Sequence, residues 1–320
     1  NEIKISYPEL RLKYLVMSQF ILHHYAMSPF SEKIRVMLGY AQVNWQSCIT
    51  REMPPRPLLA RLAGGYRKIP VAQIGADIFC DSKIIAAEIA QLSQKPLLAV
   101  ENLDAEQQSY ISKVDLEIFF AGLFVSGTMK LNLKVLKAMS VLDVARFLAD
   151  RINMGRKAKV RAVNPLKAKE VVKQHIANLE QRLNQDFLFG AQPTHADFST
   201  YHSLWFIHDL AEAPFLQGHP KLLAWMARMK DFGHGMQVQI SEQQALQAAA
   251  QAEPRVIANE HRQDALIGEK VTIAPADYGC EPTAGILVGV TSERYILARQ
   301  DPELGILHVH FPRQGYKLKT

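Results

Sequence analysis

The spacing of apolar residues changes twice along this chain. In residues 20–92, short apolar runs alternate with segments whose apolar residues recur at helical spacing. In the first of these segments, apolar residues recur every three or four positions from Phe30 to Ala41. After Pro96 the chain changes to long helical periods, and from Gly268 it returns to short apolar runs divided by Gly, Pro and Asp. A chain of 320 residues exceeds one ordinary hydrophobic core. We therefore expect two or three domains.

The first domain is expected to have the element order β-α-β-α-β-β-α. Short apolar runs predict strands at 20–25, 43–49, 69–74 and 76–80, and helices begin at Pro29, near Leu58 and at Ser82. This order is that of a thioredoxin-like α/β domain with a four-stranded mixed sheet. Behind it we predict an all-α domain with helices at about 105–126, 140–153, 165–185, from His195 and from Pro220. Strands at 271–273, 285–290, 295–298 and 307–311 predict a small β-rich accessory tail.

These patterns give the expected domain boundaries. Met17 stands directly before the first strand and looks like a translation start, so the residues before it are interpreted as an extension. We expect the tail to pack near the helical domain. The predicted parts are an N-terminal extension (1–16), a thioredoxin-like domain (17–96), a helical domain (97–240), a linking helix (241–259) and a small β domain (260–320).

Composition favours a cytoplasmic globular protein. Apolar residues make up 48% and charged residues 21% of the chain, which is typical of soluble domains. No apolar run approaches the ~18–20 residues that a membrane-spanning helix needs, and no secretory signal is visible. The three cysteines Cys48, Cys80 and Cys280 are odd in number, widely spaced and without a C-x-x-C pair. This pattern argues against a disulfide framework.

The net charge of +6 is concentrated in one segment. Twelve Lys or Arg and three Asp or Glu lie between Thr128 and His175. Such a segment could meet a nucleic-acid backbone, but the only aromatic residue within it is Phe147, and single-stranded binding normally uses several stacking rings. A solvated helix face is the simpler interpretation, so nucleic acid is an unlikely partner.

Three local motifs could bind a peptide-like ligand. Ser28-Pro29 is a helix start that offers a hydroxyl and free backbone N–H groups, although it could be an ordinary helix cap. Ile69-Pro70 enters a strand, and a cis bond there would hold the Ile69 backbone open to pair with a peptide; an ordinary trans proline is the alternative. Asp81-Ser82 opens a helix and suits an ammonium and a carboxylate, or plain capping.

Two further motifs are interpreted as structural. Thr194 and Asp197 form an S/T-x-x-D capping box before an aromatic-rich helix. His308 and His310 place two imidazoles on one strand face, but no Cys or carboxylate stands at a convincing ligand spacing, so we predict no metal site.

The order and spacing of these motifs resemble the glutathione transferase superfamily. The segment from Tyr66 to Gly75 (YRKIPVAQIG), followed by Cys80-Asp81-Ser82, looks like its glutathione-binding half, and the segment from Ser28 to Arg35 (SPFSEKIR) resembles its catalytic loop and first helix. The resemblance extends from Phe20 to about Phe232. The tail looks like an appended domain of certain bacterial transferase-like proteins.

The resemblance implies glutathione as co-substrate and assigns a role to each motif. Ser28 matches the position of the catalytic Ser or Cys and would donate a hydrogen bond to the glutathione thiolate. Ile69, before what would be a cis proline, would pair with the cysteinyl backbone. The other implied contacts are Asp81 and Ser82 at the γ-glutamyl end, Lys68 near the glycyl carboxylate, and Phe30 and Pro70 within the same site. The resemblance also implies a homodimer.

One departure limits the chemistry. Members that exchange thiols carry Cys where this chain has Ser28, and a hydroxyl cannot form a mixed disulfide. Cys80, at a strand end, is interpreted as a small core residue. This favours conjugation or isomerisation, in which the glutathione thiolate attacks a small electrophile that the sequence does not identify. The alternative is a non-catalytic regulatory or protein-interaction protein that keeps the same fold.

Overall fold

The structure is a computed structural model that describes residues 20–138, 140–157 and 163–320, so the expected extension (1–16) and Met17 lie outside the described residues. Its contacts divide the chain into two compact units. Within the described ranges, the sheet unit contains residues 20–28 together with Gln42–Ile85 and Gly235–Thr320, and the helical unit contains Pro29–Ala41 and Ala86–His234.

The sheet unit contains one mixed sheet of ten described strands. Its N-terminal part has β1 (Phe20–His24), β2 (Trp45–Ile49), β3 (Val71–Ile74) and β4 (Asp77–Cys80). Strand β1 is parallel to β2 and antiparallel to β3, and β3 is antiparallel to β4. The predicted thioredoxin-like order is therefore confirmed. A fifth strand, β5 (Gln237–Ile240), was not predicted and pairs parallel to β2.

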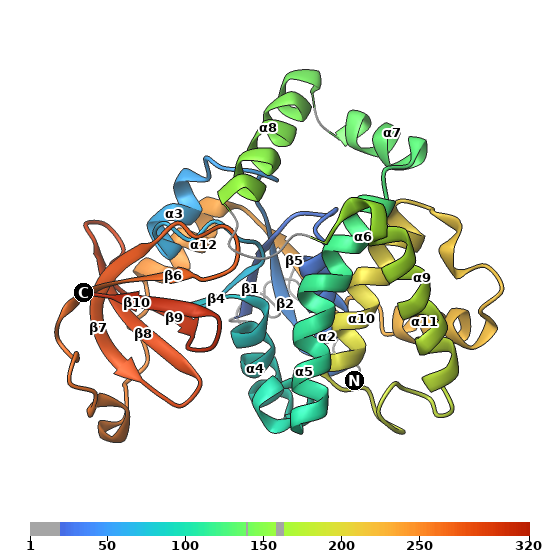
Figure 1. The fold of residues 1–320 in the computed structure, drawn as a ribbon. Helices are drawn as coiled ribbons and strands as arrows, with labels where there is room; N and C mark the ends of the chain where they lie inside the picture. Colours follow the sequence, from blue (N-terminus) through green and yellow to red (C-terminus); the bar gives the residue numbers. More distant parts are fainter. Residues whose placement is uncertain (1–19, 139, 158–162) are drawn as a thin grey trace, which may run out of the picture. The chain divides into compact units, whose positions relative to one another are not determined.

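The C-terminal strands continue this sheet (Figure 1). The four predicted apolar runs form β6 (Lys270–Pro275), β7 (Thr283–Val290), β8 (Arg294–Asp301) and β9 (Gly305–Pro312), and an unpredicted β10 (Tyr316–Lys319) pairs with β6. Strand β9 lies parallel to β4, with Asp77 opposite His308. The tail pairs with the thioredoxin-like sheet through β9, a partner that the sequence did not predict.

The tail and the N-terminal strands share one hydrophobic core. Leu62 from α3 (Pro57–Ala63) and Ile78 from β4 are 1% and 0% exposed and belong to the same cluster as Leu307 and Phe311 from β9. The cluster also takes Leu246 from α12 (Glu242–Ala250), the predicted linking helix. Burial of these side chains against each other couples the stability of the tail to that of the first four strands.

Polar contacts join the same two parts. The Arg61 guanidinium pairs with Asp301 at 2.6 Å, and Nη1 of Arg299 donates to the carbonyl oxygens of Arg61 and Leu62, which lie in the last turn of α3. The hydroxyl of Thr283 donates to the carbonyl oxygen of Ala63 at 3.0 Å. These bonds satisfy C-terminal carbonyl groups of α3 that have no partner within the helix.

The helical unit begins with α2 (Pro29–Ala41) and continues through α5 (Ala105–Lys113) and α6 (Phe119–Val125), which a π-helical turn, η3 (Val114–Ile118), joins into the predicted helix at 105–126. Helix α7 (Met129–Ala138) was not predicted. The remaining helical segments are α8 (Val141–Lys157), α9 (Pro165–Arg182), α10 (His195–Trp205), the π-helical η4 (Phe206–Leu210), α11 (Pro220–Asp231) and the short η1 (Pro96–Leu98), η2 (Val100–Asn102) and η5 (Pro214–Leu216). Two elements remain: α4 (Ser82–Ser93) begins in the sheet unit, and η6 (Asn259–Arg262) follows α12.

The capping box at the start of α10 is present as predicted. The Asp197 carboxylate accepts hydrogen bonds from the backbone N–H groups of Thr194 and Leu188, each at 2.9 Å, and from the Trp225 indole at 3.1 Å. Burial nevertheless raises the pKa of Asp197 above its usual range. The residue thus ties a loop and two helices together, which is a structural role. None of the helices in the described ranges is long and apolar enough to cross a bilayer.

Candidate functional site

Three of the predicted motifs lie at the same end of three neighbouring strands, β1, β3 and β4. In the sheet register, His23 of β1 is opposite Val71 of β3, and Val71 is opposite Cys80 of β4. Three segments therefore lie next to one another: the one after β1, the one before β3 and the one after β4. These are the segments that carry Ser28, Ile69-Pro70 and Asp81-Ser82. Pairing of antiparallel strands alone brings them together.

Ser28 occupies the position that the sequence predicts, between β1 and the first residue of α2. Its backbone N–H donates to the carbonyl oxygen of Tyr25 at 3.2 Å, which closes the turn after the strand. The residue is 2% exposed. Because a helix begins at the next residue, the N–H groups of its first turn lie close in sequence to this hydroxyl, and such groups favour an anion.

The Ile69-Pro70 peptide bond is cis, as predicted. A second cis bond, Pro54-Pro55, was not predicted. Ile69 itself lies before the first paired residue of β3, and within the described ranges no backbone group hydrogen bonds to its N–H or C=O. Its main chain is therefore a possible partner for an extended ligand.

Asp81 has an unusual backbone conformation. Its φ of 87° lies in the left-handed region that residues other than Gly rarely adopt. Its Oδ1 accepts from the backbone N–H of Lys83 at 3.0 Å and so caps α4, while its Oδ2 accepts from the hydroxyl of Tyr316 at 2.9 Å. Ser82, the first residue of α4, is 7% exposed. Strained positions of this kind persist where surrounding structure holds them, and they concentrate at ligand sites.

Lys68 and Arg67 are paired with the loop between β6 and β7. The Lys68 ammonium lies 2.7 Å and 3.0 Å from the two carboxylate oxygens of Asp277, and 4.0 Å from the centre of the Tyr278 ring. Nη1 of Arg67 lies 2.8 Å from Oε1 of Glu281. The tail therefore supplies a carboxylate to each cation.

The backbone of that loop lies close to both basic side chains. Gly279 has a φ of 61°, and a Cβ built on it would stand 3.3 Å from Cγ of Arg67 and 3.6 Å from Cγ of Lys68. Glycine thus permits both the turn and the close approach. Sequence reasoning missed this part of the site, since 209 residues separate Lys68 from Asp277 and the loop carries no recognisable motif.

Phe30 belongs to the helical unit. Its ring lies 4.9 Å from the ring of Phe119 and 4.5 Å from that of His202, measured between centroids. Next to it, the Lys33 ammonium pairs with Asp115 at 2.9 Å, and Nε2 of His202 lies 3.1 Å from the other Asp115 oxygen. Burial opposes ionisation of Asp115, but Lys33 and His202 hold its pKa well below the usual range. Sequence reasoning did not find this buried cluster.

The buried cysteines cannot act as nucleophiles at neutral pH. Cys80 is 0% exposed, and burial, with a smaller effect of Asp81, raises the pKa of its thiol well above the usual range. Burial, with a smaller effect of Glu242, raises the pKa of Cys48 to about 12. Because the thiolate is the reactive form, both side chains behave as small core residues.

Of the two histidines on β9, His310 takes part in packing. Nε2 of His310 lies 2.8 Å from Oδ1 of Asp77, and the ring stacks on Phe79 with centroids 4.7 Å apart. Burial opposes ionisation of Asp77, but His310 holds the pKa of that carboxyl below its usual range. Among the residues that the structure describes, no three His, Cys, Asp or Glu side chains are grouped to hold a metal ion.

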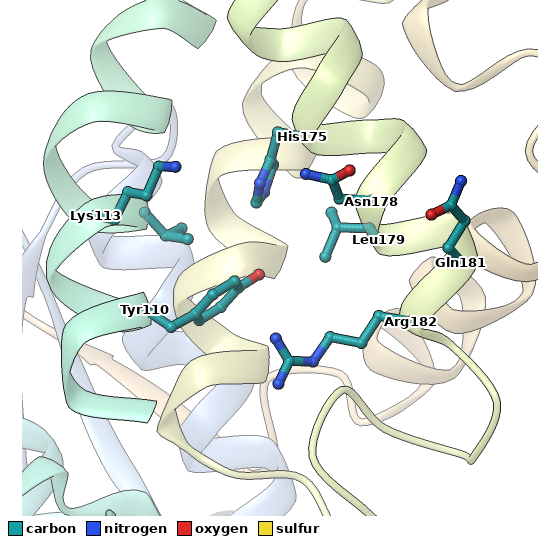
Figure 2. Close-up of a pocket in the computed structure, with 8 residues that line it drawn as sticks. Tyr110, Lys113, His175, Asn178, Leu179, Gln181 and Arg182 are labelled. Carbon is teal, nitrogen blue, oxygen red and sulfur yellow. The ribbon is translucent and has the colours of Figure 1, made fainter. Parts of the chain in front are cut away.

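A cavity of about 460 Å³ lies within the helical unit. Figure 2 shows the side chains of α5 and α9 around it: Tyr110, Lys113, His175, Asn178, Leu179, Gln181 and Arg182. Burial, with a smaller effect of Lys113, lowers the pKa of His175 to about 4, so its imidazole is neutral at pH 7. Arg182 pairs with Glu106 at 2.7 Å. The cavity offers hydrogen bonds but no activated nucleophile, and all its residues lie outside the sheet unit.

Comparison with known proteins agrees with this architecture. Residues 22–96 match the family model of the glutathione S-transferase N-terminal domain, and residues 146–228 match that of the C-terminal domain. A solved GST-like protein from Pseudomonas syringae is 33% identical, with a TM-score of 0.74, and the alignment covers 95% of this chain and 100% of that one. No protein with a curated description matches this sequence.

More distant structures share only part of the chain. A glutathione transferase family member from Pseudomonas fluorescens pf-5, solved with two glutathione bound, is 16% identical with a TM-score of 0.46, and the alignment covers 67% of this chain and 89% of that one. A glutathione S-transferase from Rhodospirillum rubrum F11 is also 16% identical, with a TM-score of 0.44 and coverage of 66% and 87%. The match to the Pseudomonas syringae protein establishes the relationship: this chain belongs to the glutathione transferase superfamily.

Proposed function

We propose that this protein binds glutathione at the strand ends next to Ser28, Ile69-Pro70 and Asp81-Ser82. The protein activates the glutathione thiol for attack on a small electrophile, in a conjugation or an isomerisation. The observation that carries the proposal is the strand register, which aligns His23, Val71 and Cys80 and so gathers these segments in a chain of this superfamily.

The polar groups at these strand ends match the functional groups of glutathione. The unpaired main chain of Ile69 can bond to the cysteinyl backbone as one more extended strand would. The Asp81 carboxylate suits the γ-glutamyl ammonium, and the N–H groups at the start of α4, with the Ser82 hydroxyl, suit the γ-glutamyl carboxylate. Lys68 and Pro70 flank the same segment, and Phe30 follows Ser28 by two positions in the sequence. One bound glutathione would thus give a partner to most of the polar groups at these strand ends.

Ser28 is the proposed thiol-activating residue. A hydroxyl that donates to the glutathione sulfur stabilises the thiolate over the thiol, and the start of α2 adds a favourable field. Lowering the thiol pKa by about two units corresponds to about 3 kcal/mol of thiolate stabilisation. Burial raises the thiol pKa of both Cys80 and Cys48, so neither of these two buried side chains competes with the glutathione sulfur as nucleophile in this proposal.

The remaining parts of the proposal concern partners. We propose a cytoplasmic homodimer whose other ligand is a small electrophile, without metal, membrane or nucleic-acid partners. Sedimentation of the full chain tests the assembly. A species of 36.0 kDa at micromolar concentration would count against the dimer.

A calorimetric titration of the full chain with glutathione tests the central proposal. We expect saturable binding that weakens in Asp81→Asn, since the ammonium loses its counter-ion, and that is unchanged in Glu303→Gln, whose side chain is 76% exposed on the tail. Absence of heat with glutathione, in protein that unfolds as cooperatively as the wild type, would reject the proposal. It would leave a non-catalytic role for the fold.

A further inference from the structure

The tail changes the charge of the two ends of the proposed site in different ways. At the Lys68 end it adds a carboxylate, because Asp277 pairs with the ammonium through both oxygens. The side chains of Lys68 and Asp277 are only 13% and 26% exposed, so solvent screens this pair incompletely. Glu281 does the same for Arg67, whose side chain is also 13% exposed.

At the Asp81 end the tail adds only a neutral group. Tyr316 donates its hydroxyl hydrogen to Oδ2 of Asp81. Burial, with a smaller effect of Asp81, raises the pKa of Tyr316 well above the usual range, so this phenol is un-ionised at pH 7. The negative charge of Asp81 is therefore kept, while the positive charges of Lys68 and Arg67 are balanced.

We infer that the C-terminal domain sets the ligand class of this site: a γ-glutamyl peptide thiol whose ammonium end is free and whose C-terminal end carries no charge, such as an amide. This inference rests on the proposed function, since it names the ligand of the same site.

The hydrogen-bonding groups at the Lys68 end fit an amide better than a carboxylate. A carboxamide oxygen can accept from the Lys68 ammonium, and its N–H₂ can donate to the Asp277 carboxylate. A free glycyl carboxylate would instead compete with Asp277 for the same ammonium and face a like charge at short range. Charge selection by a repulsive group is a common basis of specificity.

Titration of the full-length protein with glutathione and with glutathione amide tests the inference. In the wild type we expect the amide to bind about fivefold to tenfold more tightly than the free acid. In Asp277→Asn, which removes the charge and keeps the shape, we expect the preference to reverse, because Lys68 becomes available to the carboxylate. The matched control Glu303→Gln, another tail carboxylate, should keep the wild-type preference.

Two other results would overturn the inference, and they differ in what they reject. If both ligands bind but the wild type prefers the free acid, or if Asp277→Asn leaves the preference unchanged, the ligand class is wrong and glutathione binding stands. If neither ligand binds the wild type or Asp277→Asn, the proposed function falls together with the inference.

Discussion

The hydroxyl of Tyr316 donates a 2.9 Å hydrogen bond to Oδ2 of Asp81, although 235 residues separate them. Tyr316 begins β10 and Asp81 directly follows β4, so the bond joins β10 to the helix start proposed to bind γ-glutamate. A hydrogen bond to a carboxylate contributes about 1.5–3 kcal/mol. It also fixes the orientation of the Asp81 side chain, whose other oxygen caps α4.

Tyr316→Phe is therefore expected to lower the free energy of unfolding by about 1–3 kcal/mol, because Asp81 loses a partner in a partly buried position. Urea unfolding followed by circular dichroism measures the effect. Tyr295→Phe, a change of the same size elsewhere in the tail, should cost less. An unchanged midpoint for Tyr316→Phe would show that water replaces the phenol without loss.

Ser28→Ala separates a thiol-activating hydroxyl from a helix cap. If Ser28 donates to the thiolate, the substitution should raise the apparent pKa of the bound thiol by roughly one to two units. Binding at low pH, where the thiol is neutral, should change little. Thiolate absorbance against pH measures this. Asp81→Ala should instead weaken binding at every pH and leave the thiol pKa of the residual complex unchanged. A thiol pKa that does not move in Ser28→Ala would leave Ser28 as a cap only.

Leu307→Ala tests whether the tail shares its stability with the thioredoxin-like strands. Leu307 is 0% exposed in the common core, so its truncation should cost about 2–5 kcal/mol. The loss should shift a single unfolding transition of the sheet unit. Its neighbour Ile306, on the other face of the strand and 48% exposed, is the matched control and should cost much less. A separate early transition for the tail would contradict the shared core.

The pH dependence of stability should carry a contribution from His23. Burial, opposed by a smaller effect of the hydrogen bond to Gln73, lowers the pKa of His23 from 6.5 to about 4. Between these values the unfolded chain binds more protons than the folded one. The stabilisation is therefore complete above pH 6.5 and is lost as the pH falls towards 4, by about 3 kcal/mol.

Unfolding in urea at several pH values between 4 and 8 measures this slope. His23→Asn should be less stable at neutral pH but lose less stability on acidification than the wild type. His261→Asn, whose side chain is 40% exposed, should keep the wild-type slope. Equal slopes for the wild type and His23→Asn would show that folding does not lower the pKa of His23.

The buried pair Lys33–Asp115 should respond more strongly to loss of one partner than of both. Asp115→Ala removes the carboxylate that pairs with the buried Lys33 ammonium in the helical unit, which is expected to cost about 3–5 kcal/mol. Lys33→Met combined with Asp115→Leu removes both charges and should recover much of that loss. Thermal and urea unfolding compare the two. Glu117→Ala, an exposed change in the same π-helical turn, is the control. A double variant less stable than Asp115→Ala would contradict this account.

Local periodicity was enough to predict most of the fold. Strands β1, β2, β3 and β4 are short apolar runs, and the helices begin at recognisable residues such as Pro29, Pro165 and Thr194. Strand β5 could not be found in this way, because Gln237–Ile240 has only four residues and alternates polar with apolar side chains. It becomes a strand by pairing with β2, a tertiary effect that no local pattern contains.

The candidate site divides in the same manner. Ser28, Ile69-Pro70 and Asp81-Ser82 follow directly from strand ends, so their meeting could be predicted from element order. The partners Asp277 and Tyr316 could not, because their approach depends on β9 pairing with β4 and on the turn at Gly279. The proposed ligand class therefore depends on residues that only the tertiary structure brings to Lys68 and Asp81.

The pairing of β9 with β4 has a consequence for biosynthesis. Asp77 and its partner His310 are 233 residues apart, so at about 5–20 residues per second the ribosome makes β9 on the order of ten to fifty seconds after β4. During that interval β4 has one unpaired side, and open strand edges invite association with other chains. Nascent chains that end before β9 should therefore engage chaperones more strongly than released ones. Since Asp277 and Tyr316 are also synthesised long after Lys68 and Asp81, the ligand preference proposed for this protein would be acquired only after the tail strands have been made.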